Sequence, residues 1–362
     1  MLKLRRGTVV STEPLTVRVG DRERRAWADE ALVGPVEAGD EVVVNVEAAD
    51  LRLGSGGFDV VHVNLTRGLD APGHPEAHVM KLNYTSLQHP VEPVEPVEPV
   101  EAREATEPPQ RPLTMPALVV SLHGHLAPAA WAAAEARPGL RVGFVQGAGA
   151  ALPGGLSRDV VELRERGLLA GHITAGPAYG GEHEAISVAG GLDAAARELG
   201  WDAAIAGPGP GILGSASRLG HGAMAALDGA HAALALGLPT LFCPRLSSSD
   251  ERPRHRGLSH HSETVLSMLL GPVRVPVPEA ELEGWPLLDA EAPEGGSAQA
   301  ALDALIENCR DDHDISVEPI DLGGYEASGL PARTMGRALA EDPLFFAAPL
   351  AAGRALAGAV NG

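Results

Sequence analysis

The amino-acid sequence predicts an α/β protein in which a doubly wound, mainly parallel sheet of the Rossmann-like type follows a small N-terminal β-barrel domain. Three observations lead to this prediction. Short β-branched runs crowd the first 66 residues, a Val-Glu-Pro repeat interrupts the chain, and apolar segments then alternate with helical ones. A chain of 362 residues also exceeds what one hydrophobic core usually holds, so two domains are expected.

Residues 1–88 are assigned to the barrel domain and its exit segment. The runs GTVVST, LTVRVG, DEVVVNV and FDVVHVNL are separated by Gly, Asp and Pro, which is typical of short strands joined by tight turns. Such strands form a small barrel or half-barrel, and the glycines of Leu51–Gly57 suit a bulge or turn. The barrel could bind oligonucleotides, but it lacks interleaved aromatic and basic residues, so an accessory or oligomerisation role is preferred.

Residues 89–112 are assigned to a linker. Proline at every third position of the Val-Glu-Pro repeat prevents a helix and favours extended polyproline II, while the glutamates repel one another. The tract therefore predicts a stiff spacer between two domains.

Residues 113–362 alternate between strand candidates and helical segments, which is typical of a parallel sheet with helices on both faces. The strand candidates are Pro116–Gly124, Leu140–Gly147, Gly171–Gly176, Asp202–Gly207, Pro239–Arg245 and Val273–Pro278. The helical segments between them are Pro128–Arg137, Arg158–Arg166, Glu184–Leu199, Ala223–Leu236 and Ser262–Leu270. A helix at Ser297–Asp311, a strand at Ile315–Pro319 and a long Ala-rich helical tail complete the domain.

Composition limits the classes of partner. A net charge of −20 disfavours nucleic acid and anionic membranes, but it leaves room for a small anion in a locally basic pocket. The only lysines are Lys3 and Lys81, which excludes a P-loop or a Schiff-base lysine from the last three-quarters of the chain. There is no apolar leader, no run of about 18 apolar residues, and no disulfide framework from Cys243 and Cys309. A cytoplasmic protein without a membrane partner is expected.

The loops that leave the carboxyl ends of the predicted strands carry the polar and glycine-rich segments. Ligands of open parallel sheets bind at this edge, so we expect one site along this rim. The loops are His123–His125, Gln146–Gly155, Ala175–Glu184, Gly207–Gly222 and Ser247–Leu266.

Glycines of these loops are candidate ligands for a phosphate or carboxylate, because their backbone amides can surround an anion. The stretch Gly209–Gly214 fits G-x-G-x-x-G, but two prolines stiffen it and no acidic residue follows at a strand end, so dinucleotide binding is disfavoured. The alternative is a tight turn where only glycine fits. The candidates are Gly124, Gly147, Gly149, Gly207, Gly209 and Gly211.

The segment RPRHRGLSHHS supplies the strongest candidates. Ser259 can cap a helix whose first turn holds His260 and His261, and its free amides together with Arg254, His255 and Arg256 form a candidate anion site. In a purely structural loop, Asp250 and Glu251 would instead pair with the arginines.

His123, His260 and His261 are the candidate catalytic residues, as acid, base or metal ligand. If the site exists, His123 should border a common cavity with at least one of His255, His260 and His261. The histidine spacing matches no standard zinc motif, so the sequence assigns no metal and no cofactor.

The segments SLHGHLAP, GAALPGGLSRDV, GPGPGILGS, RPRHRGLSHHS and RTMGRALAEDPLFFAA resemble the landmarks of an uncharacterised bacterial family, the domain of unknown function 3866. The resemblance extends to DLRLGSGGFDVVHVNL and HVMKLNYTSLQHPVE and so covers nearly the whole chain. RPRHRGLSHHS is its most specific motif, and the Val-Glu-Pro repeat is particular to this sequence. The resemblance implies no activity, ligand or catalytic residue.

Two functions remain open on the sequence. The first is binding of, and action on, a small phosphorylated or carboxylated molecule at the rim of the sheet; whether the protein is an enzyme is left open. The alternative is a non-catalytic regulatory or assembly protein whose rim binds an effector or a partner chain. A homodimer is also expected, with Leu344, Phe345 and Phe346 of the C-terminal tail noted as bulky apolar residues that more often pack on their own core.

Overall fold

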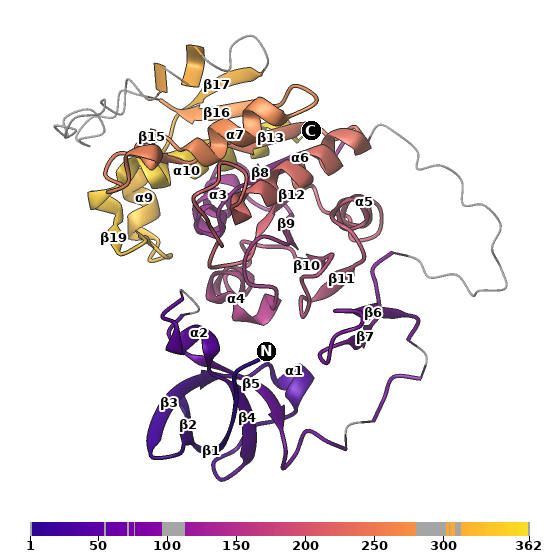
Figure 1. The fold of residues 1–362 in the computed structure, drawn as a ribbon. Helices are drawn as coiled ribbons and strands as arrows, with labels where there is room; N and C mark the ends of the chain where they lie inside the picture. The colour runs from indigo at the N-terminus through magenta and orange to yellow at the C-terminus, as the bar shows by residue number, and fades with distance from the viewer. Residues whose placement is uncertain are drawn as a thin grey trace. The chain divides into compact units, whose positions relative to one another are not determined.

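The computed structural model of the chain describes residues 2–53, 56–70, 72–75, 77–95, 113–279, 302–303, 305–307 and 313–360. The chain divides into two compact units, Met1–Glu92 and Pro93–Gly362 (Figure 1). Each has its own hydrophobic core. Within the described residues, no helix combines the length and the apolar character needed to cross a lipid bilayer.

The first unit contains the predicted barrel, which closes with the strand order β1-β2-β3-β5-β4. Its strands are β1 (Leu4–Thr12), β2 (Leu15–Val19), β3 (Arg22–Trp27), β4 (Glu41–Asn45) and β5 (Asp59–Asn64), with short helices α1 (Glu30–Val33) and α2 (Glu47–Asp50). Inward valines such as Val17, Val42 and Val44 are fully buried and fill the barrel. β3 was not predicted because its sequence, RERRAW, has no β-branched residue.

A second antiparallel pair ends this unit. β6 (Val79–Lys81) pairs with β7 (His89–Val91), so the start of the Val-Glu-Pro tract is a strand. Pro93 is the first residue of the second unit and forms a parallel bridge with Glu184 of that unit. Residues 96–112 of the predicted linker lie outside the described residues.

The second unit contains the predicted parallel sheet. All pairings of its eight strands are parallel, in the order β11-β10-β9-β12-β8-β13-β16-β17. The strands are β8 (Ala117–Val120), β9 (Val142–Gly147), β10 (His172–Ala175), β11 (His183–Ala185), β12 (Ala203–Pro208), β13 (Thr240–Cys243), β16 (Arg274–Pro278) and β17 (Asp314–Glu318).

Helices cover both faces of this sheet. Side chains alternate along β12, so that Ile205 belongs to one core while Ala204 and Ala206 belong to the other. The helices are α3 (Leu126–Ala136), α4 (Arg158–Glu165), α5 (Val188–Arg197), α6 (Ala225–Leu236), α7 (His260–Met268), α9 (Leu322–Ala327) and α10 (Pro343–Ala359). The fold class predicted from the sequence is therefore confirmed.

Some local predictions need correction. The predicted helical segment Glu184–Leu199 begins too early, because His183–Ala185 form the edge strand β11 beside β10. The helix begins later, where Ser187 accepts a hydrogen bond from the Gly190 amide. Of the helix predicted at Ser297–Asp311, only residues 302–303 and 305–307 are described, and these are helical.

The strand order sets which loops can form a site. β8 lies between β12 and β13, and β12 lies beside β9. Because all four strands are parallel, their exit loops leave from one edge of the sheet. These are four of the loops in which candidate site residues were predicted.

Candidate functional site

His123 belongs to a buried cluster between β8, β12 and α4. Its Nδ1 lies 3.1 Å from the carbonyl oxygen of Pro208, and its Nε2 lies 2.7 Å from the Ser157 hydroxyl. An Nδ1–H that donates to the carbonyl leaves Nε2 to accept from the serine. Asp159 lies 4.0 Å from the same Nε2. Burial lowers the pKa of His123, so the imidazole is neutral at pH 7.

Ser157 owes its position to helix capping. Its Oγ accepts a hydrogen bond from the Val160 amide at 3.1 Å, which makes it the N-cap of α4. Ser157 is buried, and so is His172, whose ring stacks on Phe144 next to His123. Both nitrogens of His123 therefore serve contacts within the protein.

Two of the predicted glycine ligands hold neighbouring loops together. A Cβ on Gly149 would lie 2.3 Å from the carbonyl oxygen of Gly222, and one on Gly209 would lie 2.4 Å from that of Ala151. Only glycine permits these backbones to approach so closely. A ligand role for Gly149 and Gly209 stays a prediction, as it does for Gly124, Gly147, Gly207 and Gly211.

The segment after β13 folds back on itself. β14 (Leu246–Ser247) pairs antiparallel with β15 (Gly257–Leu258), and Gly257 has a φ of 65° that suits glycine. The amide of Ser259 then donates to the carbonyl of Arg245 at 2.9 Å. The Ser259 hydroxyl accepts from the His261 amide at 3.3 Å, so the predicted cap of α7 is confirmed.

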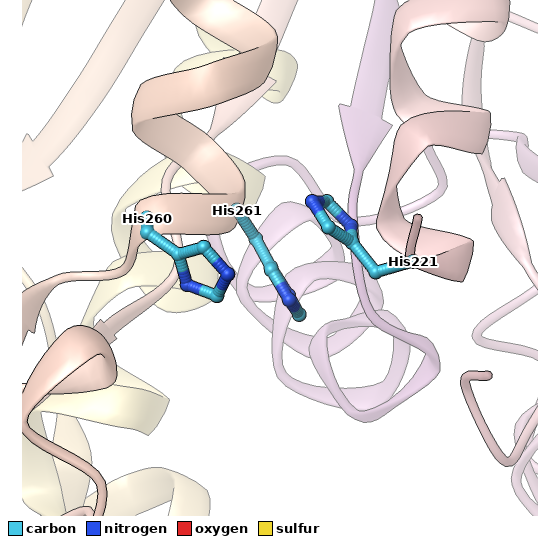
Figure 2. Close-up of side chains that lie close together, drawn as sticks. All are labelled: His221, His260 and His261. Atoms are coloured by element: carbon cyan, nitrogen blue, oxygen red, sulfur yellow. The ribbon is translucent and has the colours of Figure 1, made fainter. Parts of the chain in front are cut away.

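This hairpin and the loop after β12 together form a cluster of four histidines, which we call the histidine cluster: His221, His255, His260 and His261. The ring of His221 stacks on that of His261, with centroids 3.8 Å apart and planes inclined by 20°. His260 and His261 are 4.3 Å apart, and the ring of His255 lies 4.7 Å from His260 and 4.8 Å from His261. Figure 2 shows His261 between His260 and His221.

Two histidines of the cluster contact other groups. His255 Nδ1 lies 2.7 Å from the Ser259 hydroxyl, and His261 Nδ1 lies 3.4 Å from the guanidinium of Arg245. By contrast, in the part of the chain that the structure describes, both ring nitrogens of His221 and the Nδ1 of His260 are buried and make no hydrogen bond of normal geometry, although the Arg218 backbone lies close enough to the His221 ring to raise its pKa. Buried polar atoms are normally paired, so these nitrogens call for an explanation.

An ionic network around the buried carboxylate of Asp250 lies beside the histidine cluster. The Asp250 carboxylate contacts the guanidiniums of Arg245 at 3.0 Å, Arg252 at 3.0 Å and Arg337 at 3.5 Å. Burial alone would raise the pKa of Asp250, but the hydrogen bonds and charge of Arg252 and the charge of Arg245 hold it well below its usual range. Arg337 also contacts Asp342 at 3.0 Å.

Burial and nearby positive charge keep the four imidazoles neutral at pH 7. The pKa of His261 falls to about 2 and that of His255 to about 3, first because of burial. Arg245 and neighbouring histidines lower the pKa of His261 further. Burial also lowers the pKa values of His221 and His260. Neutral imidazoles can accept a proton, receive a hydrogen bond or bind a metal ion.

The arginines predicted as anion ligands have different surroundings. Arg256 Nε donates to the backbone carbonyl of Asp250 at 2.7 Å. Arg254 is exposed, and no side-chain partner for it occurs in the described part of the chain. The charge of Arg254 nevertheless lowers the pKa of His260, although burial and His221 lower it more.

The structure therefore brings together His255, Ser259, His260 and His261, but it places His123 in another cluster. Across the described residues, no hydrogen bond, ion pair or ring contact links His123 to that group. Sequence reasoning did not select His221 or Arg245. His221 lies in the predicted rim loop Gly207–Gly222 and Arg245 at the end of a predicted strand, so rim position was the available signal for both.

Three residues of the histidine cluster could hold a metal ion. Each of His221, His260 and His261 offers one nitrogen, and these nitrogens all lie within 4.8 Å of one another. Neutral imidazole is a common ligand of zinc and related metals.

Comparison with known proteins adds a family. A family model described as "Protein of unknown function (DUF3866)" matches residues 25–353. Neither the curated proteins nor the solved structures contain a match to this chain.

Proposed function

Since the chain belongs to the family described as Protein of unknown function (DUF3866), whose description names no activity, we propose a function from the site itself: binding of a small phosphorylated or carboxylated ligand at the C-terminal rim of the parallel sheet. The observation that carries the proposal is the surplus of guanidinium groups beside the histidine cluster. Arg245, Arg252 and Arg337 all lie within 3.5 Å of the single carboxylate of Asp250.

The charges around the cluster do not cancel. Asp342 is the second carboxylate of the network and contacts Arg337, so three guanidiniums face two carboxylates. Arg254 and Arg256 add two more positive charges from the same loop and Glu251 adds one negative charge, so an excess of positive charge remains. In a chain of net charge −20, such a local excess of arginine favours a small anion, because guanidinium binds phosphate or carboxylate through paired hydrogen bonds.

The exposure and charge of the residues around the histidine cluster suggest how each would bind the ligand. Arg252 and Arg254 are the exposed arginines of the loop, and Arg254, which does not contact Asp250, would meet the anion first. Ser259 caps the N-terminus of α7, and the positive end of the helix dipole lies at this loop. His260 and His261 are neutral and would accept hydrogen bonds from the ligand. The proposed function is binding of the ligand.

The test is a thermal-shift measurement with phosphate, pyrophosphate and citrate at constant ionic strength. A ligand of the folded state at 100 times its Kd stabilises the protein by about 2.7 kcal/mol. We expect the wild type to gain apparent stability with one of these anions. The double variant Arg254→Ala/Arg256→Ala should lose that gain.

The controls separate binding from folding. Arg354 is an exposed arginine of α10, and the variant Arg354→Ala should respond to the anion as the wild type does. The single variant Arg254→Ala removes only an exposed side chain and should melt like the wild type without ligand. An unchanged anion response in the double variant would contradict the proposal.

The alternative, an effector or partner surface on the rim, is less well supported. The four histidines contact one another as a cluster and do not spread over a flat apolar surface. The homodimer and the cytoplasmic location remain predictions. The tail residues Phe345 and Phe346, noted for the dimer, are 1 % exposed and pack in the chain's own core, so they lend the dimer no support.

A further inference from the structure

We propose that His221, His260 and His261 bind a divalent transition-metal ion of the zinc type through three imidazole nitrogens. The three residues come from two loops that are distant in sequence, and their candidate ligand atoms lie within 4.8 Å of one another (Figure 2). The proposal goes beyond anion binding, because it assigns a resident ion and does not require any anionic ligand.

The unpaired nitrogens are the first argument. His221 is 7 % exposed, yet across the described residues neither of its ring nitrogens makes a hydrogen bond of normal geometry, although the Arg218 backbone lies close to the ring; the Nδ1 of His260 makes none either. A buried nitrogen without a hydrogen-bond partner is costly. Coordination to a metal ion would satisfy the lone pair of each ring.

The chemistry of the three ligands also favours a transition-metal ion. All three groups are imidazoles, and the grouped ligand set contains no carboxylate or thiolate. Such a set suits Zn²⁺, Cu²⁺, Ni²⁺ and Fe²⁺, and it does not suit Mg²⁺ or Ca²⁺, which prefer oxygen ligands. Three histidines leave a fourth position of a tetrahedral ion open for water or an anion.

The geometry requires a small rearrangement. In a tetrahedral site with metal–nitrogen distances of about 2.0–2.1 Å, two nitrogens lie about 3.3 Å apart. The present separations of up to 4.8 Å close to that value if the rings move by roughly 1 Å. The stack of His221 on His261, at 20°, must open so that both rings point to one ion.

His255 and Arg245 are the neighbours of the proposed metal ligands. His255 Nδ1 is held by the Ser259 hydroxyl at 2.7 Å, and His255 lies outside the grouped set. Metal binding through Nε2 of His261 places the ring proton on Nδ1 and ends its contact with Arg245. That contact is 3.4 Å long, at the outer limit of a hydrogen bond, so little is lost.

The experiment is calorimetric titration of Zn²⁺ alone into the full chain, expressed without a histidine tag and treated with a chelator. We expect one Zn²⁺ per chain and no heat with Mg²⁺. Each of His221→Gln, His260→Gln and His261→Gln should weaken Zn²⁺ binding at least tenfold. Co²⁺ should give visible absorption bands of four-coordinate type in the wild type and lose them in the variants.

The matched control is His74→Gln, an exposed histidine of the first unit, which should bind Zn²⁺ like the wild type. His260 is only partly buried, so His260→Gln keeps the test valid if a variant of the more buried His221 fails to fold. Absence of Zn²⁺ binding by the wild type, or wild-type affinity in all three variants, overturns the proposal.

Zn²⁺ binding and the response to anions can be tested separately, because they depend on different side chains. The variant Arg254→Ala/Arg256→Ala keeps all three imidazoles and should still bind Zn²⁺, whatever it does to the response to phosphate or citrate. Conversely, Zn²⁺ binding without any anion response leaves the metal site intact and removes only the anionic ligand.

Discussion

At the scale of single residues, the second unit holds several histidines that burial keeps neutral. His125 is the clearest outside the histidine cluster, because it is completely buried and its Nε2 has no hydrogen-bond partner among the described residues. Its Nδ1 lies 3.4 Å from the Cys243 thiol, and its ring packs 4.9 Å from that of Phe345. Burial, followed by the positive charge of Arg245, lowers the pKa of His125 to about 3.

This shift predicts a dependence of stability on pH. The unfolded state has a histidine pKa of about 6.5 and therefore binds more protons than the native state between pH 6.5 and 3. The stability that the neutral ring permits is present above pH 6.5 and is lost as the pH falls. Between pH 7 and pH 5, His125 alone should cost about 2 kcal/mol.

The variant His125→Leu tests this prediction through urea unfolding at pH 7 and pH 5. Leucine has a similar size and no titrating group, so the variant should lose less stability than the wild type over this range. The exposed His74, changed to leucine in the same way, serves as control and should leave the wild-type slope unchanged. A slope in His125→Leu equal to that of the wild type would contradict the buried neutral imidazole.

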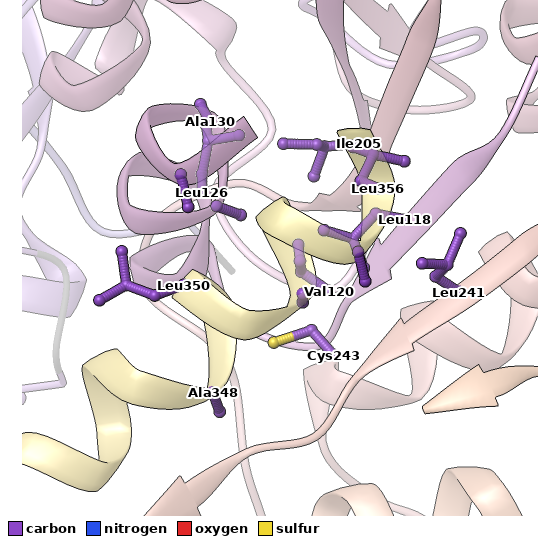
Figure 3. Close-up of a cluster of buried hydrophobic side chains, with 14 of the residues drawn as sticks. Leu118, Val120, Leu126, Ala130, Ile205, Leu241, Cys243, Ala348, Leu350 and Leu356 are labelled. Carbon is purple, nitrogen blue, oxygen red and sulfur yellow. The ribbon is translucent and has the colours of Figure 1, made fainter. Parts of the chain in front are cut away.

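At the scale of elements, the packing of α10 on α3 organises the larger core of the second unit. Leu350 and Leu356 of α10 share one buried cluster with Leu126 and Ala130 of α3, and Figure 3 shows Leu356 towards Leu118 and Ile205 of the sheet. The two helices approach closely because α10 carries Gly353 at their contact. A Cβ there would lie 2.0 Å from the backbone oxygen of Ala129.

Gly353→Ala should therefore destabilise the protein by about 1–3 kcal/mol, since the methyl group would force the helices apart. The same helix supplies the control, because Gly358 is exposed and a Cβ there meets nothing within 4 Å. Gly358→Ala should stabilise the helix by about 0.5–1 kcal/mol. Equal effects of the two changes in chemical denaturation would show that the close approach is not needed.

At the scale of the whole molecule, the chain contains two compact units with separate cores. The first core consists mainly of barrel valines such as Val44, and the second joins the parallel sheet to its helices through residues such as Leu118. Proteins of this kind often unfold in more than one transition, since each core can melt by itself.

We expect two transitions in differential scanning calorimetry. Val44→Ala removes two buried methyl groups and should lower one transition only, at a cost of roughly 2 kcal/mol. Leu118→Ala should lower the other, at about 2–5 kcal/mol. The two variants serve as controls for each other. A single transition that both variants shift would show that the units unfold together.

The periodicity of the sequence was enough to determine the fold class, because alternating strands and helices with buried apolar faces leave few arrangements other than a covered parallel sheet. The same reasoning recovered the cap at Ser259 and the barrel strands rich in valine. The sequence pattern did not predict two strands: β3, which is rich in charged residues, and the edge strand β11, which has only three residues.

The partners of each candidate residue were decided only by the tertiary structure. His221 and His261 are 40 positions apart in sequence, and they stack because the loops after β12 and β13 leave the same edge of the sheet. His123 leaves that edge as well, yet its two nitrogens bind Pro208 and Ser157 instead. Strand order brings loops to one edge, but the turn inside each loop, which no periodic pattern encodes, determines which side chains meet.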